Sequence, residues 1–274
     1  MAVISGQMPY FIDTHCHFDF PPFRGAEVAS LLSAGQANVK QIIVPAVSAD
    51  YFPRILDLAA NYPPLFAALG MHPLYIARHQ DADLATLASA LAIKTEKLVA
   101  VGEIGLDLYM DEPQLSRQLA LLNAQLKLAK QYDLPVILHS RRSHDQLASA
   151  LRKAALPRTG VVHGFAGSLV QAQAFIRLGY YIGVGGTITY ERAQKPVMSW
   201  RHYRYLHYYW RQTRRICHWL VFKVNPIDQS ERLMYSLHCV SCVKKHHKIL
   251  LLSFSSIARA YFIYLQPINP HFRF

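Results

Sequence analysis

Short apolar runs rich in β-forming residues alternate with longer amphipathic stretches, and this alternation constrains the fold of the chain more than any other feature. The predicted strands span residues 10–18, 41–47, 65–71, 98–106, 135–140, 160–165 and 181–186. Helical patterns lie between them at 27–34, 82–92, 114–131, 143–155 and 169–178. Repeated strand–helix units predict a parallel sheet covered on both faces. A chain of 274 residues is long enough for one large α/β domain of this kind.

Polar residues at the strand ends indicate how this sheet closes. The residues that fall at or just past the carboxyl end of a predicted strand are His15, His17, His72, Glu103, His139 and His163. Separate strands that deliver ionisable groups at the same end are typical of a barrel site. An open doubly wound sheet instead places its site at one switch point, usually with a glycine-rich turn, and no GxGxxG follows the first strand. The sequence therefore predicts a TIM-type (β/α) barrel.

Five of these residues, His15, His17, Glu103, His139 and His163, are candidate metal ligands. His15 and His17 are two apart on a predicted strand, so their side chains point to one face and can hold one ion, with Asp13 or Asp19 orienting an imidazole. Glu103 lies in an apolar strand, where a carboxylate is costly to bury unless it is paired or bound to metal. Each residue alone also fits an ordinary hydrogen-bonded or salt-bridged position. The whole nitrogen and oxygen donor set suits zinc, manganese or magnesium.

The motifs THCHFD, GEIGLD, LPVILHSR and VVHGFAGS occur in this order and resemble the TatD family of metal-dependent hydrolases, in particular its YjjV-type bacterial branch. GMHP at 70–73 and IGVGGTITY at 182–190 extend the resemblance over roughly residues 10–195. The resemblance implies two divalent metal ions. His15 and His17 hold one, Glu103 bridges and serves catalysis, and His139 and His163 hold the other.

The activity implied by the resemblance is phosphodiester hydrolysis, such as 3′→5′ trimming of DNA, so DNA or another phosphodiester is the expected substrate. Two ions about 3.5–4 Å apart suit in-line displacement at phosphorus. Arg141 and Arg142 follow a ligand strand and are candidates to meet phosphate, although exposed arginines are also common on any surface. A related barrel that hydrolyses amides or lactones and a non-enzymatic nucleic-acid binder remain alternatives.

The composition changes abruptly near residue 196. Residues 1–195 hold 17 Lys and Arg against 15 Asp and Glu, whereas residues 196–274 hold 12 against 2 and none of the 13 glycines. Most of the net charge of +12 therefore lies in the tail, and it says little about the substrate of the main body. We expect two segments, an incomplete hydrolase barrel at 1–195 and an unrelated basic tail at 196–274.

The tail also lacks a motif that the resemblance requires. The family has one more strand, which ends in an ETDAP-like motif whose aspartate completes the first metal site and orients the attacking water. The only acidic residues after Lys195 are Asp228 and Glu231, and neither follows a strand-like run. The predicted barrel therefore lacks its last strand and helices, and we expect this chain to be impaired.

Reading the tail one base out of frame supplies the missing motif. Taking the last base of each codon with the first two bases of the next converts residues 207–210 into three leucines, whichever synonymous codons are used. Permitted codons for residues 210–219 then give ETDAPDMPL. The Lys195-Pro196 junction can be read as Lys-Thr that has lost one adenine. We therefore interpret the tail as a frameshift product, and an inactive pseudogene product is the corresponding alternative function.

No segment reaches the roughly 20 apolar residues that a membrane helix needs, and no secretory leader pattern is seen. Four cysteines in a chain of this size do not suggest a disulfide framework. The sequence thus predicts a cytoplasmic protein without a membrane partner, and no obligate protein partner is evident.

Overall fold

The computed structural model describes residues 11–184 and 220–222, and its strands form one sheet. Each strand is hydrogen-bonded to its neighbours in sequence. The strands are β1 (Phe11–Asp13), β2 (Val39–Pro45), β3 (Leu65–Leu69), β4 (Leu98–Asp107), β5 (Val136–Arg141), β6 (Gly160–Val162), β7 (Tyr181–Val184) and β8 (Leu220–Phe222). Neighbours from β1 to β7 are parallel, whereas β8 runs antiparallel to β7.

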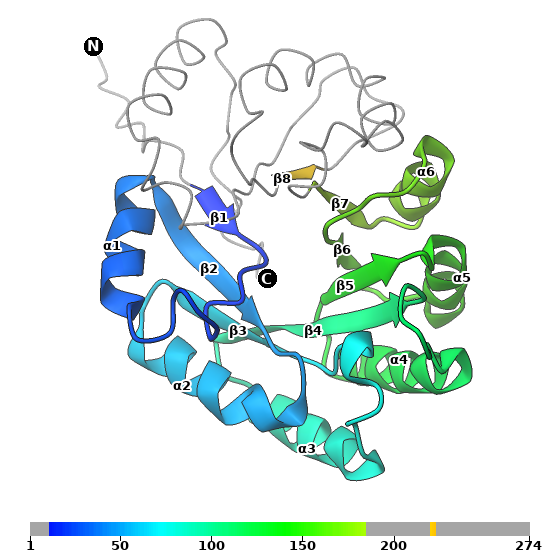
Figure 1. The fold of residues 1–274 in the computed structure, drawn as a ribbon, viewed down its shortest axis with the longest axis horizontal. Coiled ribbons are helices and arrows are strands. Elements are labelled where there is room, and N and C mark those ends of the chain that lie inside the picture. Colours follow the sequence, from blue (N-terminus) through cyan, green and yellow to red (C-terminus); the bar gives the residue numbers. More distant parts are fainter. Residues whose placement is uncertain (1–10, 185–219, 223–274) are drawn as a thin grey trace, which may run out of the picture.

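The helices of the described residues lie on the outer side of a curled sheet (Figure 1). They are α1 (Glu27–Gln36), α2 (Phe52–Asn61), α3 (Asp81–Ala92), α4 (Leu115–Gln131), α5 (His144–Ala154) and α6 (Leu169–Arg177), with short 3-10 turns η1 (Ala49–Tyr51) and η2 (Pro73–Tyr75). Consecutive right-handed crossovers that all step in one direction place every helix on the same face. A doubly wound sheet has helices on both faces, so the arrangement is that of a barrel wall.

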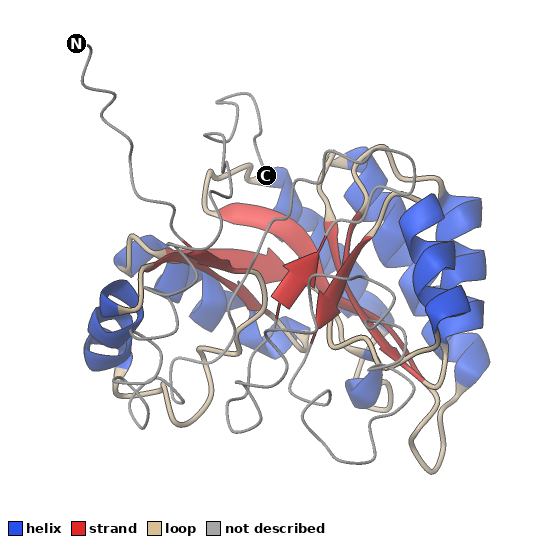
Figure 2. Ribbon diagram, turned by 90° about the horizontal axis from the view of Figure 1, so that it is seen from above, coloured by secondary structure: helices blue, strands red, loops and turns tan. Residues whose placement is uncertain are grey.

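The predicted fold class is confirmed as a curled sheet of parallel strands with outer helices. Seen from above, the strands fan across the middle of the molecule among the helices (Figure 2). Within the described residues the sheet is an incomplete barrel, because β1 and β8 form its two ends and do not pair with each other. The antiparallel β8 also differs from the parallel strand that closes a (β/α) barrel. The predicted domain boundary at 195 lies outside the described residues.

Two clusters of apolar side chains hold the sheet in this shape. The larger one packs the outer face of the strands against the helices, with members such as Leu58 of α2, Leu122 of α4 and Phe175 of α6. The smaller one contains no helix residue and therefore lies on the inner, concave face. It consists of Ile43, Ala68, Val99, Ala100, Ile137 and Val161. The inner cluster fills the barrel below the strand ends, so the polar residues at those ends stand on a packed floor.

Gly105 permits the close approach of β4 and β5 beside the polar cluster. Its φ of +144° is rarely adopted by other residues, and a Cβ at this position would overlap the carbonyl oxygen of His139. We expect Gly105→Ala to lower the free energy of unfolding by about 2–5 kcal/mol, since a left-handed backbone costs about 1–2 kcal/mol and overpacking adds about 1–3 kcal/mol.

Gly25→Ala is the matched control for this prediction. Gly25 also has a positive φ, of +81°, but a Cβ added there would meet no atom within 4 Å, so only the backbone penalty applies. Urea unfolding of the two variants compares them directly. Equal losses of stability would show that the contact with β5 is unimportant.

Candidate metal centre

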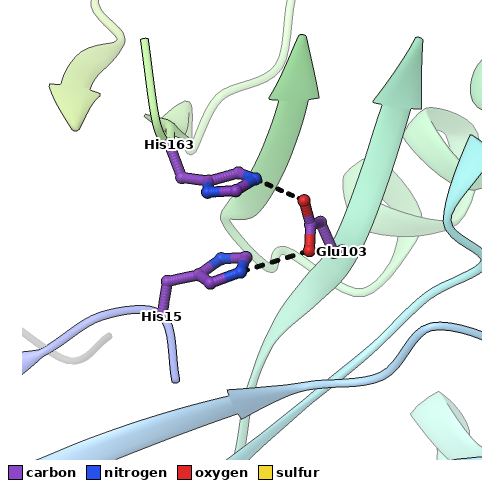
Figure 3. Close-up of side chains that lie close together, drawn as sticks. All are labelled: His15, Glu103 and His163. Carbon is purple, nitrogen blue, oxygen red and sulfur yellow. Dashed lines mark ion pairs between the residues drawn. The ribbon is translucent and has the colours of Figure 1, made fainter. Parts of the chain in front are cut away.

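Glu103 stands at the centre of a group of five histidines. It lies in β4, whose ten residues are all buried, and is itself only 1% exposed. The distances from Oε2 of Glu103 are 3.2 Å to His15 Nε2 and 3.4 Å to His17 Nε2. Oε1 lies 3.1 Å from His72 Nε2 and 3.2 Å from His139 Nδ1, and it also contacts His163 Nε2. Figure 3 shows His15 and His163 reaching the two oxygens of this carboxylate from the separate segments that follow β1 and β6.

The two histidines of the THCHFD motif converge as predicted, although they lie beyond the end of β1 and not within it. Their Nε2 atoms are 3.3 Å apart, and the ring of His15 stacks on that of His163 with centroids 3.8 Å apart. Asp13 supports this turn by accepting a hydrogen bond from the backbone N–H of His15 at 3.0 Å. His15 is buried, whereas the side chain of His17 is 35% exposed. His17 therefore faces the open side of the cluster.

His139 is held between two carboxylates. Its Nδ1 faces Glu103, and its Nε2 lies 2.9 Å from Oδ2 of Asp107, the last residue of β4. With the proton on Nε2, the imidazole donates to Asp107 and turns its Nδ1 lone pair toward the centre. This is the usual way in which a carboxylate outside a metal site orients a histidine ligand.

All five predicted ligands are brought together, and two further residues belong to the cluster. His72 stands at a predicted strand end, but a single histidine before a proline is weak evidence for a ligand, so the sequence assigned it no role. Asp107 closes the GEIGLD motif and likewise received no role. Its even spacing from Glu103 along one strand was an available signal, since residues i and i+4 of a strand face the same side.

The electrostatics of the cluster favour the neutral imidazole at His15, His72 and His163, whereas the pKa values of His17 and His139 are raised by their carboxylate neighbours in spite of burial. Burial raises the pKa of Glu103, but attraction to His163, His72 and His15 outweighs it and holds the pKa well below its usual value. Burial also lowers the pKa of His15, His72 and His163. Neutral histidines present lone pairs, which is the form that binds metal.

The donor set fits divalent metal ions. Two groups of residues could each hold an ion, His15–Glu103–His163 and His72–Glu103–His139. Within each group the ligand atoms lie within 4.8 Å of one another, and both groups include Glu103. The ligand sets implied by the family resemblance divide the histidines differently but share the same carboxylate. Oε2 of Glu103 is buried and accepts no hydrogen bond, despite two imidazole nitrogens within 3.4 Å. Imidazole nitrogens that approach Oε2 without hydrogen-bond geometry are arranged as metal ligands would be, with their lone pairs directed at a cation.

We expect metal affinity to rise with pH because His139 must lose a proton to bind. Burial lowers the pKa of His139, but hydrogen bonds to Asp107 and Glu103 outweigh this and raise it to about 9. Below that pH an ion bound by His139 displaces its proton, so the dissociation constant of that ion, measured with manganese(II), should fall about tenfold per unit between pH 6.5 and 8.5. Calorimetric titrations at several pH values measure this slope.

Asp107→Asn serves as the comparison in the same titrations. It removes the carboxylate that raises the pKa of His139, so the rise in affinity should level off at a lower pH. An affinity that is independent of pH in the parent chain would contradict the expectation.

A curled parallel sheet that carries histidines and a glutamate at the carboxyl ends of its strands defines a barrel of the metal-dependent hydrolase class. A family model described as TatD related DNase matches residues 12–205, and the chain belongs to this family. It is 65% identical over 185 residues to the uncharacterized metal-dependent hydrolase YjjV of Escherichia coli K12, which covers 68% of this chain and 71% of that protein.

Two further comparisons agree with this assignment. The crystal structure of YjjV, a TatD homolog from Escherichia coli K12, superposes with a TM-score of 0.68 at 63% identity, over 69% of this chain and 73% of that one. A protein of Edwardsiella piscicida named 3′-5′ ssDNA/RNA exonuclease TatD is 34% identical over 180 residues, or 65% of this chain and 68% of that protein. Among the described residues, no helix combines the length and apolar character of a membrane span.

Proposed function

We propose that the barrel is a phosphodiesterase with a two-metal centre, which trims single-stranded nucleic acid from its 3′ end. The observation that carries the proposal is the convergence of five imidazoles on both oxygens of one buried carboxylate. Relatives named as nucleic-acid exonucleases support the choice of substrate class. The proposed ligands are His15, His17, Glu103, His139 and His163, with His72 as an added member.

The residues of the chain divide the work of such a centre. When bound, a pair of divalent ions supplies Lewis acidity and a water of lowered pKa. Glu103 belongs to both candidate ligand groups, with Oε2 beside His15 and His17 and Oε1 beside the other three histidines, and it keeps the two groups together. Asp107 fixes the ring of His139. His17, on the exposed side, leaves the centre open to a substrate, while the apolar floor beneath it excludes water from the other side.

We further propose that residues 196–274 come from a shifted reading frame and that this chain is impaired by loss of the final aspartate. The change in composition at residue 196 supports this, as does the end of the family match at residue 205. Sequencing the locus tests the proposal. It fails if the codons of residues 196–220 do not encode Glu-Thr-Asp-Ala-Pro when they are read one base over.

Substrate class is tested with matched chromogenic compounds. The chain as it stands and a frame-restored chain are each supplied with manganese(II) or zinc and assayed with bis(p-nitrophenyl) phosphate, p-nitrophenyl acetate and a p-nitroanilide. We expect the phosphodiester to be the preferred substrate of the restored chain. Preference for the ester or the anilide would assign the barrel to carbonyl chemistry and overturn the proposal.

A further inference from the structure

An exposed tyrosine with two arginines on its ring lies at the ends of β4 and β5. The ring of Tyr109 is 49% exposed, and the guanidinium carbons of Arg141 and Arg142 lie 4.0 and 4.1 Å from its centroid. Both arginines are exposed. Cation–π contact of one arginine with an aromatic ring is common. Two arginines on one exposed ring are unusual, because their like charges repel each other.

The backbone holds this cluster in place. Arg141 ends β5 opposite Asp107 of β4, and its carbonyl oxygen accepts a hydrogen bond from Leu108 N at 2.8 Å. Tyr109 N donates to Oδ1 of Asp107 at 2.7 Å. Arg142 has a φ of +54°, a left-handed conformation that costs a non-glycine residue about 1–2 kcal/mol. The chain therefore accepts local strain at the residue that brings the second guanidinium onto the ring.

Neither arginine of the cluster forms an ion pair within 4.0 Å with a carboxylate in the part of the chain that the structure describes. Arg54, Arg78 and Arg158 each lie within 4.0 Å of a carboxylate oxygen. Within residues 11–184 no such ion pair forms for Arg141 or Arg142, although Asp111 and Glu112 follow on the same loop as Tyr109. Their N–H donors thus remain available for an anion, and guanidinium groups match phosphate oxygens with paired hydrogen bonds.

The cluster is joined to the metal centre through one side chain. Oδ1 of Asp107 accepts a hydrogen bond from the backbone N–H of Tyr109, and its Oδ2 lies 2.9 Å from Nε2 of His139. We propose that Tyr109, Arg141 and Arg142 form a clamp for a phosphate of a single-stranded polynucleotide, next to the phosphate at the metal centre. This inference rests on the proposed nuclease function and adds how the substrate strand is held. Tyr109 positions the two guanidinium groups, and their edges contact the backbone.

The clamp is tested by the binding of fluorescein-labelled hexathymidylate to the full chain, measured by anisotropy in EDTA. The double variant Arg141→Ala/Arg142→Ala should weaken binding about fivefold at 0.1 M salt and reduce the slope of log affinity against log salt by about 0.7, the contribution of the one phosphate that the clamp neutralises. The control Arg152→Ala/Lys153→Ala removes two exposed charges near the far end of α5 and should change binding less than twofold. The basic tail is identical in all these proteins. Equal losses in the two double variants would overturn the clamp.

A neutral probe separates phosphate contact from base stacking. A hexathymidylate with methylphosphonate linkages has no backbone charge, so the difference between the parent chain and Arg141→Ala/Arg142→Ala should disappear. If the difference persists, the arginines contact bases and the proposal is wrong. Because no turnover is measured, failure of the chain to hydrolyse any substrate leaves this result intact. Conversely, hydrolysis with unchanged binding in the arginine variant sinks the clamp alone.

Discussion

Inserting one adenine at the Lys195-Pro196 junction is expected to raise phosphodiester hydrolysis by about 10²–10⁴-fold, which is the usual contribution of a general base. The described strands already bring Glu103 and five histidines to one place. The family resemblance assigns the remaining role, orientation of the attacking water, to an aspartate that the present tail lacks. If the tail is frameshifted as proposed, the insertion supplies that aspartate and the strand that carries it, and it leaves residues 1–195 unchanged.

The measurement is kcat/KM for bis(p-nitrophenyl) phosphate at saturating manganese(II), for the chain as it stands and for the restored chain. The control is the restored chain with the aspartate of Glu-Thr-Asp-Ala-Pro changed to asparagine, which keeps the restored strand but removes the base. Its rate should return close to that of the present chain. If both restored proteins are equally active, the gain comes from closure of the barrel and the role given to the aspartate is wrong.

The strand pattern was predictable because each strand of a parallel sheet is buried on both faces and therefore forms a continuous apolar run. The apolar run at residues 98–106 predicts a strand, and β4 spans Leu98–Asp107. The prediction is less accurate for β1, which ends at Asp13 and not near residue 18. The residues after Asp13 continue as the segment that carries His15 and His17 toward Glu103, and apolar character alone cannot distinguish a buried loop from a strand.

Helix α2 lies outside the predicted helices. It begins at Phe52 with Pro53 in its first turn, a position that proline favours, and it buries Phe52, Ile55, Leu58 and Ala59. A periodic apolar face was therefore present in the sequence. Ser48 precedes the turn η1, Ala49–Tyr51, but its side chain makes no capping hydrogen bond, and α2 begins only after this turn.

Which histidines group together in the candidate site was harder to predict than which residues belong to it. Histidines at the ends of separate strands were recognisable because all strand ends meet at one rim of a barrel. How they pair depends on ring rotations and on partners such as Asp107, which sequence spacing does not determine. The stacking of His15 on His163 joins the first and sixth strands across the barrel mouth, a contact with no local sequence signal.

Glu103→Gln is expected to remove most metal binding while leaving the fold intact. The carboxylate is the one group shared by both candidate ligand sets, so we expect its loss to weaken an ion held by either set. Loss of a residue that merely supports a ligand costs about 10–100-fold in metal affinity, and we expect loss of the shared ligand to cost at least about 100-fold. At a metal concentration equal to the dissociation constant of the parent chain, occupancy then falls from one half to about one hundredth.

Calorimetry with manganese(II) and the thermal midpoint of the metal-free protein distinguish a ligand from a structural role. Glu96→Gln makes the same chemical change at an exposed position and should bind metal as the parent does. In Glu103→Gln the stabilisation of the protein by added metal should disappear, because stabilisation by a ligand depends on its affinity for the folded state. A variant that keeps two ions with unchanged affinity would mean that Glu103 serves the histidines through hydrogen bonds and is not the bridge of a metal centre.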